Sequence, residues 1–176
     1  MRHLLEVRPD LTSEAEEIAR SLLHEVNYED VAAEIEDEIR ALDYEDLDAR
    51  AGSYEWGYVE PSEAAVEILE DKLEPFVEDL KRQLGLGLEA EALEICRGLV
   101  QGCYQLSEHE GGDVLGWAPD FPGEAAGHAL ELWYTGTDDP KSRGTRRNKR
   151  PSLPPDFLSL IPKWVPMIER VGKGTK

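Results

Sequence analysis

The chain has 176 residues, with 38 acidic and 19 basic side chains, a net charge of −19 at pH 7, and 40% hydrophobic residues. This length suits one domain of ordinary size, and the apolar share is that of a globular protein rather than a disordered one. The sequence has no run of about 18 apolar residues and no apolar signal core near Met1, so we predict a cytoplasmic protein without membrane contact.

The net charge of the sequence changes from negative to positive near residue 140. Residues 1–140 carry 36 acidic and 9 basic side chains, net −27, whereas residues 141–176 carry 2 acidic and 10 basic ones, net +8. An acidic body repels nucleic-acid phosphates and attracts basic partners. The change predicts two parts, an acidic all-helical domain over residues 1–136 and a basic, Pro-rich tail over residues 137–176.

The first part of the chain reads as successive helices. Apolar residues at three- and four-residue spacing predict helices over residues 11–27 and 28–42, and the polar face of the second is almost wholly acidic. Asp43 can cap a short third helix that extends to Arg50.

The next segment, residues 53–61, is aromatic and is predicted to be an ordered loop. Tyr54, Trp56 and Tyr58 alternate along it beside acidic residues. Large aromatic side chains with polar tips supply much of the binding energy at protein interfaces, so these three could dock a basic or Pro-rich peptide. The other interpretation is that the rings hold the loop against the helical core, and both stay open.

A long helical pattern follows from Pro61 to Gly85, and Pro75 within it predicts a kink or the start of a new helix. Residues 85–88, Gly-Leu-Gly-Leu, predict a tight turn. Residues 89–106 then form the most apolar helix, which we expect at the centre of the fold.

Two pairs of small residues mark that central helix. Gly98 and Gly102 are four residues apart and predict the close approach of a neighbouring helix. Cys96 and Cys103 are seven apart, about 10.5 Å along a helix, which is too far for a disulfide. We therefore predict two buried core cysteines without a catalytic role.

A further helix is expected after Trp117, reaching about Tyr134, and no segment keeps a two-residue strand alternation for more than five residues. The fold class predicted is all-α. Antiparallel helical hairpins would form a compact bundle or a short helical-repeat stack, followed by an extended Pro-rich C-terminal tail.

A helix, a Gly-Leu-Gly-Leu turn and the run Glu-Ala-Glu-Ala-Leu-Glu-Ile occur together in residues 75–106. This segment resembles the helix-turn-helix hairpins of helical-repeat proteins of the tetratricopeptide or HEAT kind. Such families bind protein segments on a grooved surface, so the resemblance implies an interaction module. The 34-residue period and the Trp and Pro landmarks of the tetratricopeptide consensus are absent.

The sequence contains few motifs that indicate catalysis or metal binding. Glu124 and His128 could share a metal only with further ligands, for example from Glu16, Glu17 or His24, and no zinc, phosphate-loop or nucleophile-elbow motif occurs. We therefore predict no cofactor, no metal and no enzymatic activity.

The tail divides into a linker, residues 137–152, and an apolar docking segment, residues 153–171. Six of the ten residues 141–150 are basic, and the candidate contact residues among them are Arg146, Arg147, Lys149 and Arg150. Trp164 is the candidate contact residue in the docking segment, which could cover the end of the helical stack or insert into a partner.

We therefore expect a protein-protein interaction or adaptor module that presents an acidic helical surface to a basic or Pro-rich segment of a partner. The alternative is a nucleic-acid-associated accessory protein that acts only through the basic arm, residues 141–150. No feature of the sequence indicates an oligomeric state.

Overall fold

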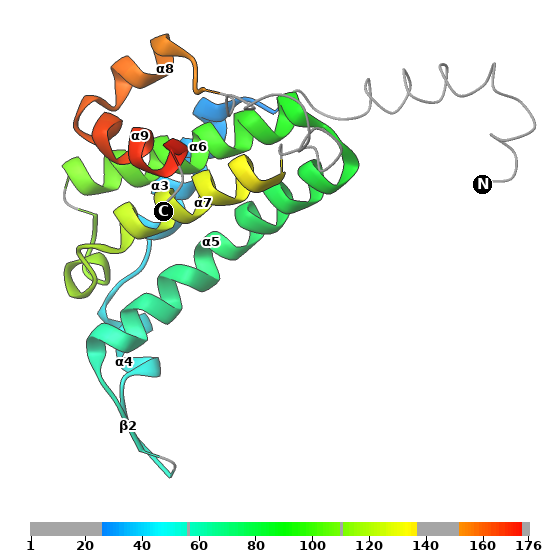
Figure 1. The fold of residues 1–176 in the computed structure, drawn as a ribbon. Helices are drawn as coiled ribbons and strands as arrows, with labels where there is room; N and C mark the ends of the chain where they lie inside the picture. The colour runs from blue at the N-terminus through cyan, green and yellow to red at the C-terminus, as the bar shows by residue number, and fades with distance from the viewer. Residues whose placement is uncertain (1–25, 56, 110, 137–151, 174–176) are drawn as a thin grey trace, which may run out of the picture.

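The computed structural model describes residues 26–55, 57–109, 111–136 and 152–173. Within these ranges it contains seven α-helices, two short strands and two 3-10 turns, and the helices pack together into a bundle (Figure 1). The predicted all-α fold is therefore confirmed. The predicted helix over residues 11–27 lies outside the described residues except for its last two positions.

Helix α6 (Glu89–Glu108) lies at the centre of this bundle, as its apolar sequence predicts. It packs against α3 (Tyr28–Arg40), α5 (Pro61–Leu86) and α7 (Phe121–Gly136). Ten of its residues are buried, and they occur on several sides of the helix because neighbours cover it from three directions. The buried residues are Ala92, Ile95, Cys96, Gly98, Leu99, Val100, Gly102, Cys103, Tyr104 and Leu106.

Helices α3 and α6 approach each other closely because α6 presents glycine at their contact. A Cβ atom added to Gly98 would lie 2.5 Å from Cβ of Val31, and one added to Gly102 would lie 3.0 Å from the carbonyl oxygen of Ala32. Ordinary carbon contacts are about 3.5–4.0 Å, so no larger residue fits without a shift. The close approach predicted from these two glycines is confirmed.

Helix α5 is continuous over 26 residues, so no new helix begins at Pro75. Pro75 has no N–H to donate to the carbonyl oxygen of Asp71, and both residues are exposed. The helix ends at Gly87 in the left-handed conformation, φ 74°. The Gly87 and Leu88 amides donate to the carbonyl oxygens of Leu84 and Gln83, each at 3.0 Å, and this Schellman motif turns the chain into α6.

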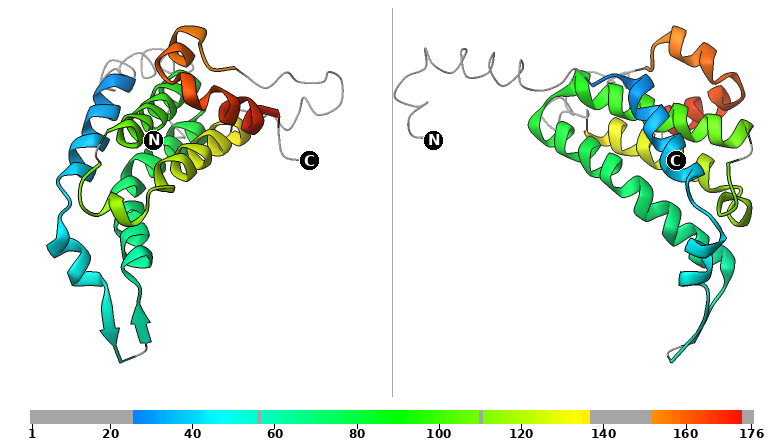
Figure 2. Two further views of the ribbon diagram at one scale, coloured as in Figure 1. Left: turned by 90° about the vertical axis from the view of Figure 1, so that its left-hand side faces the viewer. Right: turned by 180° about the vertical axis from the view of Figure 1, so that it is seen from behind.

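The short helix α4 (Tyr44–Arg50) leads into a β-hairpin. Asp43 is its N-cap residue, as predicted, and forms a capping box with Asp46. Strands β1 (Gly52–Tyr54) and β2 (Gly57–Val59) then pair antiparallel, with Tyr54 opposite Gly57, and extend away from the bundle (Figure 2). The prediction of a loop over residues 53–61 is therefore wrong in part. The strands were missed because three residues are too few for a two-residue alternation of apolar and polar side chains to be recognised in the sequence.

The C-terminal segment is helical rather than extended in its described part. Helix α8 (Pro155–Leu160), the 3-10 turn η3 (Pro162–Trp164) and helix α9 (Val165–Lys173) follow one another, and α9 packs on α7. The prolines stand in the first turns of these elements, where they begin helices instead of interrupting them. The segment buries Leu153, Phe157, Ile161 and Ile168.

A largely buried cation joins this segment to the bundle. The Arg97 guanidinium on α6 lies 3.9 Å from the ring centre of Tyr28 and 5.0 Å from that of Phe157, and its side chain is 12% exposed. Glu94 accepts its hydrogen bond at 2.7 Å. The guanidinium charge is therefore paired with Glu94 and stacked on two aromatic rings, as a largely buried cation requires.

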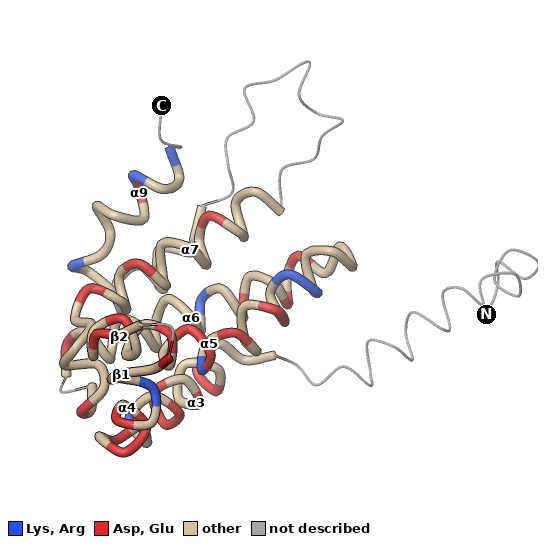
Figure 3. Tube along the Cα trace, turned by 90° about the horizontal axis from the view of Figure 1, so that it is seen from below, with Lys and Arg blue, Asp and Glu red and all other residues tan. Residues whose placement is uncertain are grey.

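Acidic residues outnumber basic ones among the described residues and follow one another along α3, α4 and α5 (Figure 3). Glu124 and Glu131 lie on α7, whereas the C-terminal helix α9 carries two basic residues near its end. None of the helices described here has both the length and the low charge needed to cross a membrane.

Candidate functional site

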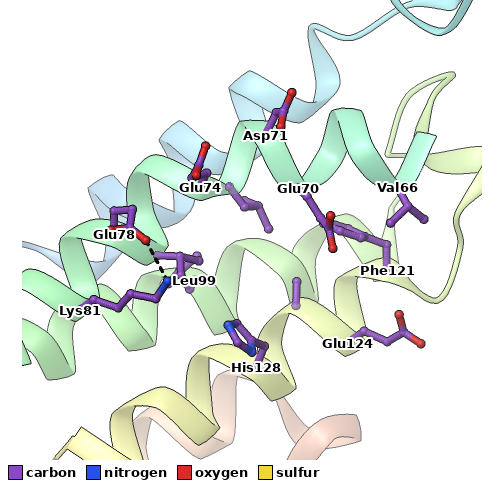
Figure 4. Close-up of a pocket in the computed structure, with 13 residues that line it drawn as sticks. Val66, Glu70, Asp71, Glu74, Glu78, Lys81, Leu99, Phe121, Glu124 and His128 are labelled. Carbon is purple, nitrogen blue, oxygen red and sulfur yellow. Dashed lines mark hydrogen bonds and ion pairs between the residues drawn. The ribbon is translucent and has the colours of Figure 1, made fainter. Parts of the chain in front are cut away.

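A groove lies between α5 and α7, with α6 beneath it (Figure 4). Its volume is about 490 Å³, which falls in the range of ligand-binding clefts. The floor is apolar and consists of residues from all three helices. These are Val66, Leu73, Val77, Leu99, Phe121 and Ala125.

Carboxylates line the edges of this apolar floor. Glu70, Glu74 and Glu78 follow one another on α5 at four-residue spacing, one helical turn apart, and Glu124 lies on α7. Glu70 and His128 extend into the space between the two helices (Figure 4). The α5 sequence places its acidic residues beside its apolar stripe, so that packing of the stripe against α6 and α7 brings them to the edge of the groove.

Three of these carboxylates are without a cationic partner. Among the described residues, Glu70, Glu74 and Glu124 form no ion pair, whereas Glu78 pairs with Lys81 at 2.8 Å. All three are exposed, so water solvates them when the groove is free. The groove therefore combines an apolar floor with an uncompensated negative edge, the chemistry that a cationic amphipathic ligand would match.

A second, shallower groove of about 380 Å³ continues from the first toward the 3-10 turn η1 (Leu115–Trp117). The two share Val66, Phe121 and Glu124. Trp117 lines the second groove and is 47% exposed, which is a large exposure for tryptophan. The combined surface, which we call the α5–α7 groove, reaches from Trp117 to Lys81.

The side chains of the groove do not make a metal centre. Although Glu124 and His128 both line it, no group of three or more His, Cys, Asp or Glu residues in the described part of the chain could hold a metal ion. The further ligands suggested from the sequence, Glu16, Glu17 and His24, lie outside the described residues.

The two cysteines belong to the core. Cys96 and Cys103 are free and buried on α6, as the sequence predicts. Burial raises the pKa of the Cys103 thiol to about 12 and raises the pKa of Cys96 further. Since the thiolate is the nucleophile, neither side chain is activated for chemistry at neutral pH.

The aromatic residues predicted as a docking surface are not brought together on one face. Tyr58 pairs with Ser53 across the hairpin, whereas Tyr54 pairs with Gly57, so the two tyrosines lie on opposite faces. Tyr54 donates to the carbonyl oxygen of Arg50 at 2.8 Å, and Tyr58 is 59% exposed. Trp56, the third predicted residue, lies outside the described residues.

Trp164 has a packing role in the structure. Its ring meets that of Tyr104 on α6 edge to face, with centroids 5.3 Å apart. Next to it, Lys163 donates to Glu108, and this hydrogen bond is the main cause that raises the pKa of Lys163. The predicted basic contact residues lie outside the described residues. These are Arg146, Arg147, Lys149 and Arg150.

The sequence analysis did not single out the α5–α7 groove. The four-residue repeat of Glu70, Glu74 and Glu78 was a visible signal, but it resembled the solvated face of any amphipathic helix. Glu124 and Trp117 are about 50 residues distant from it in sequence. Only the packing of α7 on α5 and α6 brings these groups together.

The comparisons with known proteins add no relative to this description. A scan against models of protein families, a search of curated proteins and a search of solved structures each found no significant match to the chain. The function must therefore be argued from the groove itself.

Proposed function

We propose that this protein is an interaction module that binds a basic segment of a partner protein in the α5–α7 groove. The supporting observation is the apolar floor edged by Glu70, Glu74 and Glu124, three carboxylates that pair with no cation among the described residues. Apolar contact supplies affinity, and the negative edge selects cationic partners and speeds their approach.

The surrounding charge strengthens this argument. Residues 1–140 carry a net charge of −27, so the groove lies on a body whose long-range field attracts cations and repels phosphate backbones. A diffuse field alone would bind any cation weakly, however. The apolar floor gives one position on this body a reason to hold a basic segment in a defined place.

A direct test is the fluorescence anisotropy of a labelled lysine- and leucine-containing peptide titrated with the full chain. The groove variant carries Glu70→Gln, Glu74→Gln and Glu124→Gln. At about 0.5 kcal/mol for each exposed ion pair, the three changes together should weaken binding roughly tenfold.

The matched control carries Glu34→Gln, Asp37→Asn and Asp48→Asn. These residues are exposed on α3 and α4, do not line the groove and form no ion pair in the described structure. This variant has the same change in net charge, so we expect its affinity to stay within about twofold, because charges more than about 10 Å away are screened at 0.1 M salt. Equal weakening by both variants would contradict a localised site.

Binding of nucleic acid can be measured in the same kind of titration. A labelled RNA or DNA fragment bound more tightly than the peptide, with binding lost when Arg146, Arg147, Lys149 and Arg150 become Gln, would favour the accessory-protein alternative and oppose our proposal.

A further inference from the structure

We infer that the segment bound in the α5–α7 groove is an amphipathic α-helix with basic flanks, anchored at one end against Trp117. This inference rests on the proposed function and specifies the partner of the same site.

The groove has the length of a short helix. Along α5 its lining runs from Ser62 to Lys81, and the two hollows join at Val66 and Phe121. At 1.5 Å per residue this stretch of α5 is about 28 Å long, so a helix of roughly 18 residues would fill it.

The walls favour a helix over an extended peptide. An extended segment gains affinity by donating and accepting main-chain hydrogen bonds at the edge of a sheet. Both long walls here are helices, α5 and α7, whose interior amide and carbonyl groups bond within their own turns, except for the carbonyl group of Asp71 opposite Pro75. An extended peptide would lose hydrogen bonds to water without replacement, whereas a helix brings its backbone groups already paired.

The pattern of the lining also fits a helix. Val66, Leu73 and Val77 lie on one side of α5 at spacings of seven and four residues, next to the acidic edge. A partner helix with apolar residues at positions i, i+4, i+7 and i+11 would cover this floor, and Lys or Arg beside them would meet Glu70 and Glu74. Trp117 supplies an exposed aromatic anchor, the residue type most enriched among dominant interface contacts.

Segments of this chain match the groove poorly. The basic arm, residues 141–150, has cations but no apolar side chain for the floor. The predicted amphipathic segment 11–27 has four carboxylates and one arginine, so the acidic edge would repel it. A second copy of the acidic surface is repelled for the same reason, and a basic helix of another protein is the occupant that satisfies both features.

The test uses three labelled peptides of about 18 residues, of which the first two share one composition of lysine, leucine and alanine. The first has leucine at helical spacing, the second has the same residues in strand-like alternation, and the third repeats the first with two central alanines replaced by proline. We expect the first to bind at least tenfold more tightly than the others and to gain helical circular dichroism when the full chain is added.

Two substitutions locate the bound helix. Trp117→Ala should weaken binding of the first peptide roughly tenfold or more. Tyr58→Ala is the matched control, because it also removes an exposed aromatic ring but lies on the hairpin and outside both hollows. We expect it to change the affinity less than twofold.

The outcomes separate this inference from the proposed function. Equal binding of all three peptides, still weakened by the groove variant, would overturn the helix and leave a charge-selective groove. If no peptide binds, both proposals fail. A larger effect of Tyr58→Ala than of Trp117→Ala would overturn the assignment to the groove and place docking on the hairpin.

Discussion

Single residues on α6 determine how closely its neighbours approach. Gly98 and Gly102 allow α3 to pack against the backbone of α6, and Cys96 and Cys103 fill small spaces on the same helix. At these positions the size of the side chain affects stability more than its helix propensity does, because the surrounding buried atoms are already in contact.

Gly98→Ala should therefore destabilise the protein. The added methyl group would lie 2.5 Å from Val31, and overpacking of this kind costs about 1–3 kcal/mol, more than the gain of about 1 kcal/mol from helix propensity. Gly127→Ala is the control, since a Cβ at this position on α7 meets nothing within 4 Å. Urea denaturation should show Gly98→Ala less stable and Gly127→Ala as stable as the original chain or more so. A stabilising effect of both would contradict the close packing.

The buried thiols predict a loss of stability at high pH. An unfolded cysteine ionises near pH 8.5, whereas folded Cys103 has a pKa of about 12 and Cys96 ionises even less readily. Above pH 8.5 the unfolded state therefore binds fewer protons than the folded state, and the free energy of unfolding falls by about 1.4 kcal/mol per pH unit for each thiol.

This pH effect can be measured by urea denaturation between pH 8 and pH 10.5. Because lysine and tyrosine also titrate there, the reference is the variant with Cys96→Ala and Cys103→Ala, whose stability should decline less steeply. Parallel curves for the two proteins would argue against buried, protonated thiols. Slow labelling by a polar thiol reagent at neutral pH is the corresponding kinetic observation.

At the scale of elements, local signals placed most helix boundaries well. Asp43 caps α4 and α6 begins at Glu89 as expected, whereas α5 extends to Leu86, one residue beyond the predicted end at Gly85. Pro75 was ambiguous because a proline can begin a helix or interrupt one. The hairpin was missed because its pairing depends on two three-residue strands, which contain too few residues for a period to appear.

Pro75→Ala should stabilise α5. Proline in a helix interior removes one hydrogen bond and costs up to about 3 kcal/mol, and Pro75 is exposed, so its ring contributes little packing that alanine would lose. We expect a higher urea midpoint with an unchanged denaturant slope. A lower midpoint would show that the proline ring or a bend at this position is required for packing.

For the whole molecule, the question is how the C-terminal segment and the acidic bundle are held together. Residues 152–173 bury apolar side chains against α6 and α7, and the Arg97 guanidinium lies over the rings of both Tyr28 and Phe157. This attachment is mainly apolar. The opposite net charges of the basic arm, residues 141–150, and the acidic body predict contact between them, and this prediction is not tested because the arm lies outside the described residues.

Phe157→Ala should therefore loosen the C-terminal segment from the bundle. Truncating a fully buried phenylalanine typically costs about 3–5 kcal/mol. Leu160→Ala on the same short helix is the control, since Leu160 is largely exposed and its loss should cost less than about 1 kcal/mol. Only the first variant should increase the fluorescence of an apolar dye.

The salt dependence of the stability lost in Phe157→Ala shows whether apolar packing or charge attraction holds the C-terminal segment. Burial of apolar surface is not screened by salt as exposed ion pairs are, so the stability lost in Phe157→Ala should be similar at about 0.1 M and 0.5 M NaCl. A loss that disappears at high salt would mean that charge, rather than packing, holds the segment.

The sequence by itself determined the helices from α3 to α7, the cap of α4, the central position of α6 and the close approach of a neighbouring helix at its two glycines, because these depend on period and residue size within short segments. Tertiary structure decided the rest. Tyr54 and Tyr58 look like one aromatic cluster in sequence, yet strand pairing places them on opposite faces. Glu70, Glu124 and Trp117 have no local relation, and they share a groove only because the buried stripes of α5 and α7 pack on α6 and leave their acidic edges facing the same opening.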